Sequence, residues 1–103
     1  MTNYLLAYRG GSMPESESER AAVMADWNRW FGELGDAVVD GGNPYGVSAS
    51  VAADGRVGDR GTTGLGGYSI VSAASLDAAT QLAKGCPLRK AGGSIDVYET
   101  LAM

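Results

Sequence analysis

The chain has 103 residues, 45% of them hydrophobic and 19% charged, a composition that predicts one globular domain over residues 1–103. Its formal net charge of -4 repels phosphate backbones and anionic membrane surfaces, so we expect no nucleic acid and no membrane among its partners. The sequence contains no histidine, which excludes a Ser-His-Asp triad, a Cys-His dyad and histidine-ligated zinc within the chain.

The predicted elements begin with a strand over residues 4–8, which neither a basic stretch nor a long apolar run precedes. We therefore expect no signal peptide and no membrane span, and a cytoplasmic location. After a loop, Ser16 and Glu19 have the capping-box spacing that predicts a helix from about Glu17. Its apolar residues recur at offsets of four, seven, eight and eleven, which places one stripe against the core: Val23, Trp27, Trp30, Phe31 and Leu34.

The middle of the chain predicts short strands joined by turns. A strand over residues 36–40 leads through the turn-rich residues 41–46 to a strand over residues 47–53, as a hairpin. Asp54-Gly55 is a tight-turn pair that leads to a brief return strand at residues 56–58. The glycines from Gly55 to Gly67 lack the Gly-Lys-Ser/Thr ending of a phosphate loop, so we favour a flexible flap or a hairpin tip.

A strand over residues 68–72 is followed by a helix that Ser75 caps and that Gly85 and Pro87 end. Cys86, between these two residues, is the only cysteine of the chain. We expect it to be a small buried core residue, and we expect no thiolate-ligated metal site. A last strand over residues 94–99 completes the order βαββαβ. This order predicts an α+β, ferredoxin-like fold, with an antiparallel sheet and two helices on one face.

The central strands carry apolar side chains on both of their sides. Tyr4, Leu6 and Tyr8 point opposite to Leu5 and Ala7, so the face without helices also needs a cover. Pairing of two identical surfaces is the commonest cover for such a patch. We therefore predict a homodimer through this open sheet face.

Polar residues at strand ends, next to the apolar stripe, predict a cleft between the first helix and the sheet. Asp40 is the catalytic candidate, as a partly buried carboxylate for general acid-base chemistry, and the alternative is a solvated strand-end aspartate. Arg9 would bind an anionic ligand or pair with a surface carboxylate. The Asn43 amide would contact the ligand, or Asn43 would only initiate the turn. The ligand-binding candidates are Tyr8, Arg9, Asn43 and Tyr45, and we expect no metal and no cofactor.

Six short segments carry a family resemblance: residues 4–6, 13–16, 34–46, 66–68, 85–87 and 92–99. Together they resemble the YCII-related domain family, in its DGPF-like branch. The resemblance implies a dimeric α+β barrel over residues 1–103. Members of the YCII group are thought to use a histidine and an aspartate in a cleft, and without a histidine no catalytic residue carries over to this chain. The family's Asp-Gly-Pro-Phe stretch corresponds to residues 54–57, which keep only the turn pair.

Two function classes follow from these observations. The first is a small dimeric protein that binds, and in the enzymatic case transforms, a small molecule in the cleft. The alternative is a non-catalytic dimer that regulates or scaffolds another protein. An RNA-recognition module of the same topology would need basic residues beside the aromatic ones on the central strands, and residues 68–71 lack them. Trp27 and Trp30 would stack on a flat ligand in the first class, although helical spacing favours the core.

Overall fold

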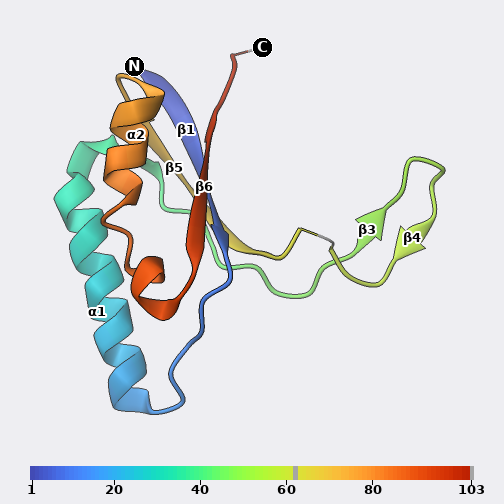
Figure 1. The fold of residues 1–103 in the computed structure, drawn as a ribbon, viewed down its shortest axis with the longest axis horizontal. Coiled ribbons are helices and arrows are strands. Elements are labelled where there is room, and N and C mark those ends of the chain that lie inside the picture. The colour runs from blue at the N-terminus through green and yellow to red at the C-terminus, as the bar shows by residue number, and fades with distance from the viewer. Residues whose placement is uncertain (62, 103) are drawn as a thin grey trace.

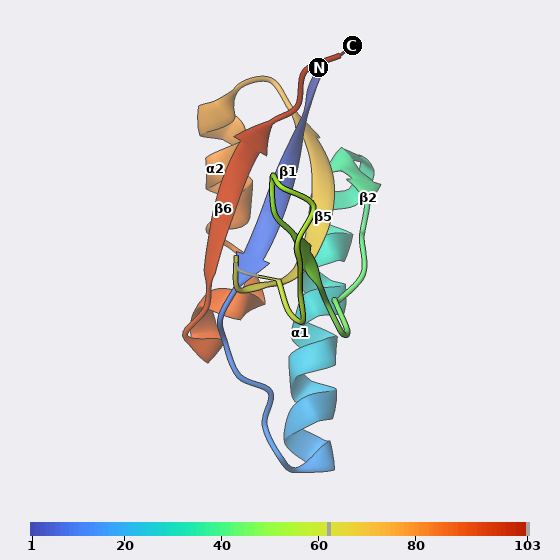
Figure 2. The ribbon, with the colours of Figure 1, turned by 90° about the vertical axis from the view of Figure 1, so that its right-hand side faces the viewer.

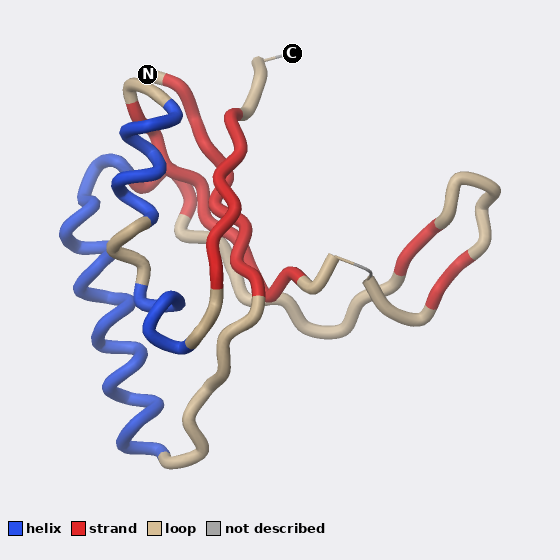
Figure 3. Tube along the Cα trace, in the orientation of Figure 1, coloured by secondary structure: helices blue, strands red, loops and turns tan. Residues whose placement is uncertain are grey.

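The computed structural model describes residues 1–61 and 63–102, and within them four strands form one antiparallel sheet. α1 (Glu17–Leu34) and α2 (Leu76–Ala83) lie on one face of this sheet (Figure 1, Figure 3). The first and third strands of the βαββαβ repeat occupy the centre, which confirms the predicted ferredoxin-like α+β fold. From edge to edge, the strands are β2 (Val38–Asp40), β5 (Leu65–Ala73), β1 (Thr2–Arg9) and β6 (Ser94–Glu99).

Side-chain caps begin both helices where the sequence predicts them. Ser16 Oγ accepts a hydrogen bond from the Glu19 amide at 3.2 Å, and Ser75 Oγ accepts one from the Ala78 amide at 3.1 Å. Each bond satisfies an amide that the first helical turn leaves without a backbone partner. α1 ends at Gly35, whose φ of 55° is one that glycine adopts without strain. Among the described residues, no helix has both the length and the apolar content needed to cross a membrane.

The core lies between the two helices and the sheet face that they cover. Along β1, Tyr4, Leu6 and Tyr8 are buried, as their alternation predicts. The aromatic stripe of α1 packs against them, with Trp30 buried and its indole Nε1 donating to the Leu82 carbonyl at 3.2 Å. This bond joins α1 to α2, so the sheet-facing sides of the two helices share one core.

Cys86 lies in the same core and is only 2% exposed. Burial disfavours a thiolate and raises the pKa of its thiol to about 11. The thiol therefore keeps its proton at neutral pH and is a poor nucleophile. These features confirm that Cys86 is a small buried core residue.

The chain after β2 differs from the prediction. β2 pairs with β5 and not with the strand expected over residues 47–53, so the hairpin between residues 36–40 and 47–53 is wrong. Of the expected strand only β3 (Ser50–Val51) forms, and it pairs with β4 (Val57–Gly58), which confirms the return strand. β3 and β4 stand away from the sheet on the side opposite the helices (Figure 1, Figure 2). After β2 the chain stays beside β5, where Pro44 bridges Gly67 and the Tyr45 amide donates to the Gly66 carbonyl at 2.9 Å, and it leaves the sheet beyond this point.

Apolar and aromatic side chains occupy the sheet face that the helices leave open. Leu5 of β1 lies in register with Ile70 of β5 on one side and with Tyr98 of β6 on the other. Tyr98 is 54% exposed. Figure 2 looks onto this face, and both helices lie behind the sheet. The homodimer through this face stays a prediction.

Candidate functional site

A cavity of about 710 Å³ lies between α1 and the end of the sheet. The first turns of α1 extend beyond the point where β1 ends, so no strand lies beneath this part of the helix (Figure 1). The loop after β1, the turn after β2 and the 3-10 helix η2 (Pro87–Ala91) form the other walls. Because glycine has no side chain, several wall segments contribute only backbone and leave the space open. These glycines are Gly10, Gly11, Gly41, Gly42, Gly66 and Gly67.

Aromatic rings form the wall on the side of α1. Trp27 lines the cavity and meets the Tyr8 ring edge to face, with 5.2 Å between the ring centroids. It packs in the same way on Trp30 at 5.7 Å, and Phe31, which also lines the cavity, lies 5.9 Å from it. Such edge-to-face pairs add to the stability that burial alone provides. The cavity therefore has a rigid aromatic wall.

A short chain of hydrogen bonds holds the opposite wall. The Tyr8 hydroxyl donates to Ser69 Oγ at 2.7 Å, and Ser69 Oγ donates to the Gly41 carbonyl at 2.7 Å. Ser69 is completely buried, and burial raises the pKa of Tyr8 well above its ordinary value, so its phenol stays protonated. Both hydroxyl protons are committed to partners within the protein. The chain therefore positions the turn after β2 against β5, and Tyr8 is not a proton acceptor at neutral pH.

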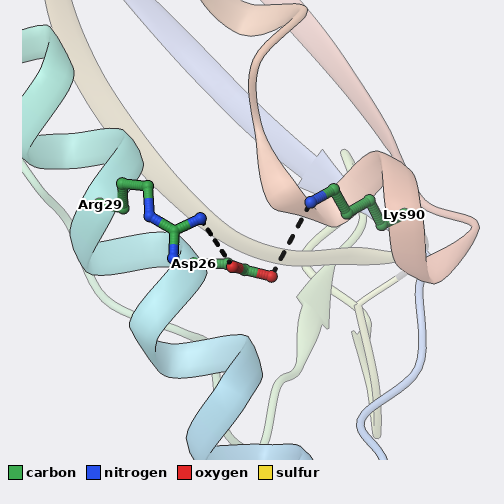
Figure 4. Close-up of polar contacts among 3 residues, drawn as sticks. All are labelled: Asp26, Arg29 and Lys90. Carbon is green, nitrogen blue, oxygen red and sulfur yellow. Dashed lines mark hydrogen bonds and ion pairs between the residues drawn. The ribbon is translucent and has the colours of Figure 1, made fainter.

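Charged side chains meet at the rim of the cavity (Figure 4). Asp26 Oδ1 lies 3.4 Å from Arg29 Nη1 within α1, and Asp26 Oδ2 lies 3.9 Å from Lys90 Nζ on η2. Asp26 and Lys90 line the cavity, and within the part of the chain that the structure describes they are its only charged lining residues. The rim thus places one carboxylate and one ammonium group beside an otherwise apolar and aromatic space.

The structure brings two of the predicted site residues to this cavity, Tyr8 and Asn43. Arg9 follows Tyr8 directly, so its side chain points to the other side of β1, where it pairs with Asp96 at 2.9 Å. Both partners of this pair are about half exposed, so the surface-pair alternative for Arg9 is confirmed. The predicted placement of Arg9 in the cleft is therefore wrong.

Asp40 and Tyr45 also lie outside the cavity lining, which corrects the predicted cleft further. Asp40 is exposed, not partly buried, and accepts hydrogen bonds from the Gly42 amide at 2.8 Å and from the Tyr68 hydroxyl at 3.1 Å. The bond to Asp40 raises the pKa of Tyr68. Tyr45 stacks on Tyr68 with 6.1 Å between ring centroids. Asp40 and Tyr45 thus adjoin the cavity only through Tyr68, which lines it, and a catalytic role for Asp40 stays a prediction.

Sequence reasoning missed the charged residues of the rim. The spacing of Asp26 and Arg29 indicates a pair on one helix, because residues three apart are neighbours on a helix surface. No local signal brings Lys90 to them, since η2 and α1 meet only in the folded chain. Among residues 1–61 and 63–102, no group of three or more histidine, cysteine, aspartate or glutamate side chains is placed to hold a metal ion.

Among the curated proteins, none matches this chain. Among solved structures, the fold is similar to that of 5-chloro-2-hydroxyhydroquinone dehydrochlorinase (TftG) from Burkholderia phenoliruptrix, in complex with 2,5-dihydroxybenzoquinone. The TM-score is 0.57 at 22% sequence identity, and the match covers 97% of this chain and 95% of that chain. The sequence pattern of the YCII-related domain matches residues 4–103, almost the full length described above. This protein therefore belongs to the YCII-related domain family.

Proposed function

We propose that this protein binds a small planar molecule in the cavity between α1 and the sheet. The observation that carries the proposal is a space of about 710 Å³ with an aromatic wall at Trp27 and Phe31 and with charges only at its rim. Ligand sites are typically concave and mostly apolar, with few polar groups that set the orientation. A flat ring placed against Trp27 gains stacking energy without ordering a flexible side chain.

The structural neighbour supports the size and shape of the ligand. TftG has the same fold and is in complex with 2,5-dihydroxybenzoquinone, a flat six-membered ring with four oxygen substituents. A molecule of this size occupies a small part of the cavity described here. We therefore propose quinones, phenols and related single rings as the ligand class, and use 2,5-dihydroxybenzoquinone as the first probe.

Isothermal titration calorimetry with this probe tests the site. Trp27→Leu keeps the wall apolar but removes the ring, so the affinity for the probe should fall at least about fivefold. Tyr45→Leu removes an exposed ring outside the cavity lining and serves as the matched control, with affinity within about twofold of the original. Equal affinities of the original protein and the Trp27 variant would contradict the proposed site.

We also propose that two copies pair through the open sheet face. Leu5, Ile70 and the exposed Tyr98 support this pairing, since they form a row across three neighbouring strands. Sedimentation velocity at micromolar concentration should show a dimer, and Tyr98→Lys should shift it toward the single chain, because it would place a charge from each copy in an apolar interface. A single chain in both samples would contradict the pairing. A stable dimer that binds no planar probe would favour the alternative, a regulatory or scaffolding module.

A further inference from the structure

The rim of the cavity has a charge opposite to that of the whole chain. The two charged lining residues, Asp26 and Lys90, balance each other, and Arg29, which pairs with Asp26 from outside the lining, brings the net charge of this cluster to +1. The full sequence has a formal net charge of -4. A local positive charge at the opening of an apolar space attracts anions, and the low dielectric of the walls strengthens the attraction. The rim therefore favours a ligand with a negative charge.

Lys90 is free to change partners. Its Nζ lies 3.9 Å from Asp26 Oδ2, beyond hydrogen-bond distance, and its side chain is 77% exposed. Exposed pairs of this kind contribute little to stability. If Lys90 turns to a ligand, Asp26 keeps Arg29 as its partner at 3.4 Å, so no carboxylate is left alone.

The interior of the cavity offers no competing charged donor. The hydroxyl protons of Tyr8 and Ser69 are already donated within the protein, and among the described lining residues Lys90 is the only cation. An acidic substituent therefore has its strongest partner at the rim, while the ring to which it is attached has its best partner in Trp27 inside. These two contacts define one orientation of the ligand.

On the basis of the proposed function, we infer that the ligand is a planar anion and that Lys90 is its specificity-determining residue. The class comprises phenolates, the enolates of hydroxyquinones and aryl carboxylates, all of which place a delocalised negative charge at the edge of a ring. Lys90 Nζ binds this charge at the rim, and Trp27 packs on the ring. Asp26 tunes the site in the opposite sense, because its carboxylate repels the anion and competes for Lys90.

Two probes and three variants test this inference by isothermal titration calorimetry. 2,5-Dihydroxybenzoquinone has acidic hydroxyls that ionise at neutral pH, and its dimethyl ether, 2,5-dimethoxybenzoquinone, is the neutral counterpart. Lys90→Met keeps an unbranched side chain one atom shorter and removes its charge, so it should weaken binding of the anionic probe about fivefold, with no effect on the neutral probe. Asp26→Asn should strengthen binding of the anionic probe about threefold. Lys84→Met removes the chain's other lysine, which does not line the cavity, and should change neither affinity.

Three outcomes would overturn the inference. The first is that Lys90→Met leaves the affinities for both probes unchanged, and the second is that it weakens binding of both probes equally. The third is that Asp26→Asn weakens binding of the anionic probe. In each of these cases both probes still bind the original protein, so the proposed function survives. Failure of both probes to bind the original protein would instead overturn the proposed function and the inference with it. Thermal melts of each variant show that it is folded, as expected for exposed or half-exposed positions.

Discussion

Ser69→Ala should destabilise the protein more than Tyr8→Phe, although each change removes one hydroxyl from the same hydrogen-bond chain. In Tyr8→Phe, Ser69 still donates to the Gly41 carbonyl, and only an acceptor position of Ser69 becomes empty. In Ser69→Ala, the Tyr8 hydroxyl loses its acceptor inside the protein, where Tyr8 is only 8% exposed, and the Gly41 carbonyl loses its donor. A buried polar group without a partner costs more free energy than a lost hydrogen bond.

The magnitudes follow from these partners. Tyr8→Phe removes one neutral hydrogen bond and should lower the free energy of unfolding by about 1 kcal/mol. Ser69→Ala removes two bonds and leaves the phenol unsatisfied, so we expect about 3 kcal/mol, or on the order of 15 °C in Tm for a domain of this size. Adding Tyr8→Phe to Ser69→Ala removes the unsatisfied phenol. The double variant should therefore lose only about 2 kcal/mol, which is less than the Ser69 variant alone.

Urea titrations followed by tryptophan fluorescence measure these free energies, because Trp27 and Trp30 pack next to Tyr8 and in the same core. The midpoint should shift while the slope with urea concentration stays constant, which shows that the surface exposed on unfolding is unchanged. Circular dichroism on the same samples checks that the transitions coincide. Additive losses in the double variant, or a smaller loss for Ser69→Ala than for Tyr8→Phe, would refute the reasoning.

Gly42→Ala should cost at least about 2 kcal/mol in urea titrations, because φ is +74° and a Cβ there would overlap the Tyr68 carbonyl. Gly46→Ala, with no neighbour within 4 Å of its Cβ, is the control and should cost far less. An unfolded Cys86 thiol ionises above its ordinary pKa of 9.0, whereas the folded thiol keeps its proton up to about 11. The stabilising contribution of the protonated thiol is therefore fully present below pH 9, and the free energy of unfolding should fall by about 1 kcal/mol between pH 9 and 10. Cys86→Ala should reduce this fall, and an equal fall in the variant would contradict the prediction. Asp40→Asn should leave the affinity for 2,5-dihydroxybenzoquinone within about twofold by calorimetry, and a tenfold loss would place Asp40 in the binding site.

Local patterns predicted most of the fold. The caps at Ser16 and Ser75, the aromatic stripe of α1 and the alternation along β1 each depend on neighbours within one element. Helix and strand geometry repeat along a single segment, so such patterns can be read without knowing what the segment packs against. The DGPF-like branch stays a prediction, because residues 54–57 retain only the turn of the family's namesake stretch.

The strand expected over residues 47–53 formed only at residues 50–51, because strand formation depends on a partner outside the segment. Its alternation is typical of a strand, but a strand forms only where a partner edge is available. β2 pairs with β5, and the chain after it stays beside β5 as far as the bridge between Pro44 and Gly67 before it leaves the sheet. Beyond that point residues 50–51 pair with the nearby return strand after the Asp54-Gly55 turn, which gives the short pair of β3 and β4.

By itself, the sequence determined the order of elements, their boundaries within a few residues, the buried stripe and the absence of imidazole chemistry. The tertiary structure alone decided which polar residues share a space. The opposite sides of Tyr8 and Arg9 follow from the alternation along β1, whereas Asp26 and Lys90 come from distant segments and meet at one rim only in the folded chain. The reason is that a side chain's neighbours across elements depend on how a helix packs on a sheet, and no period along the chain encodes that packing.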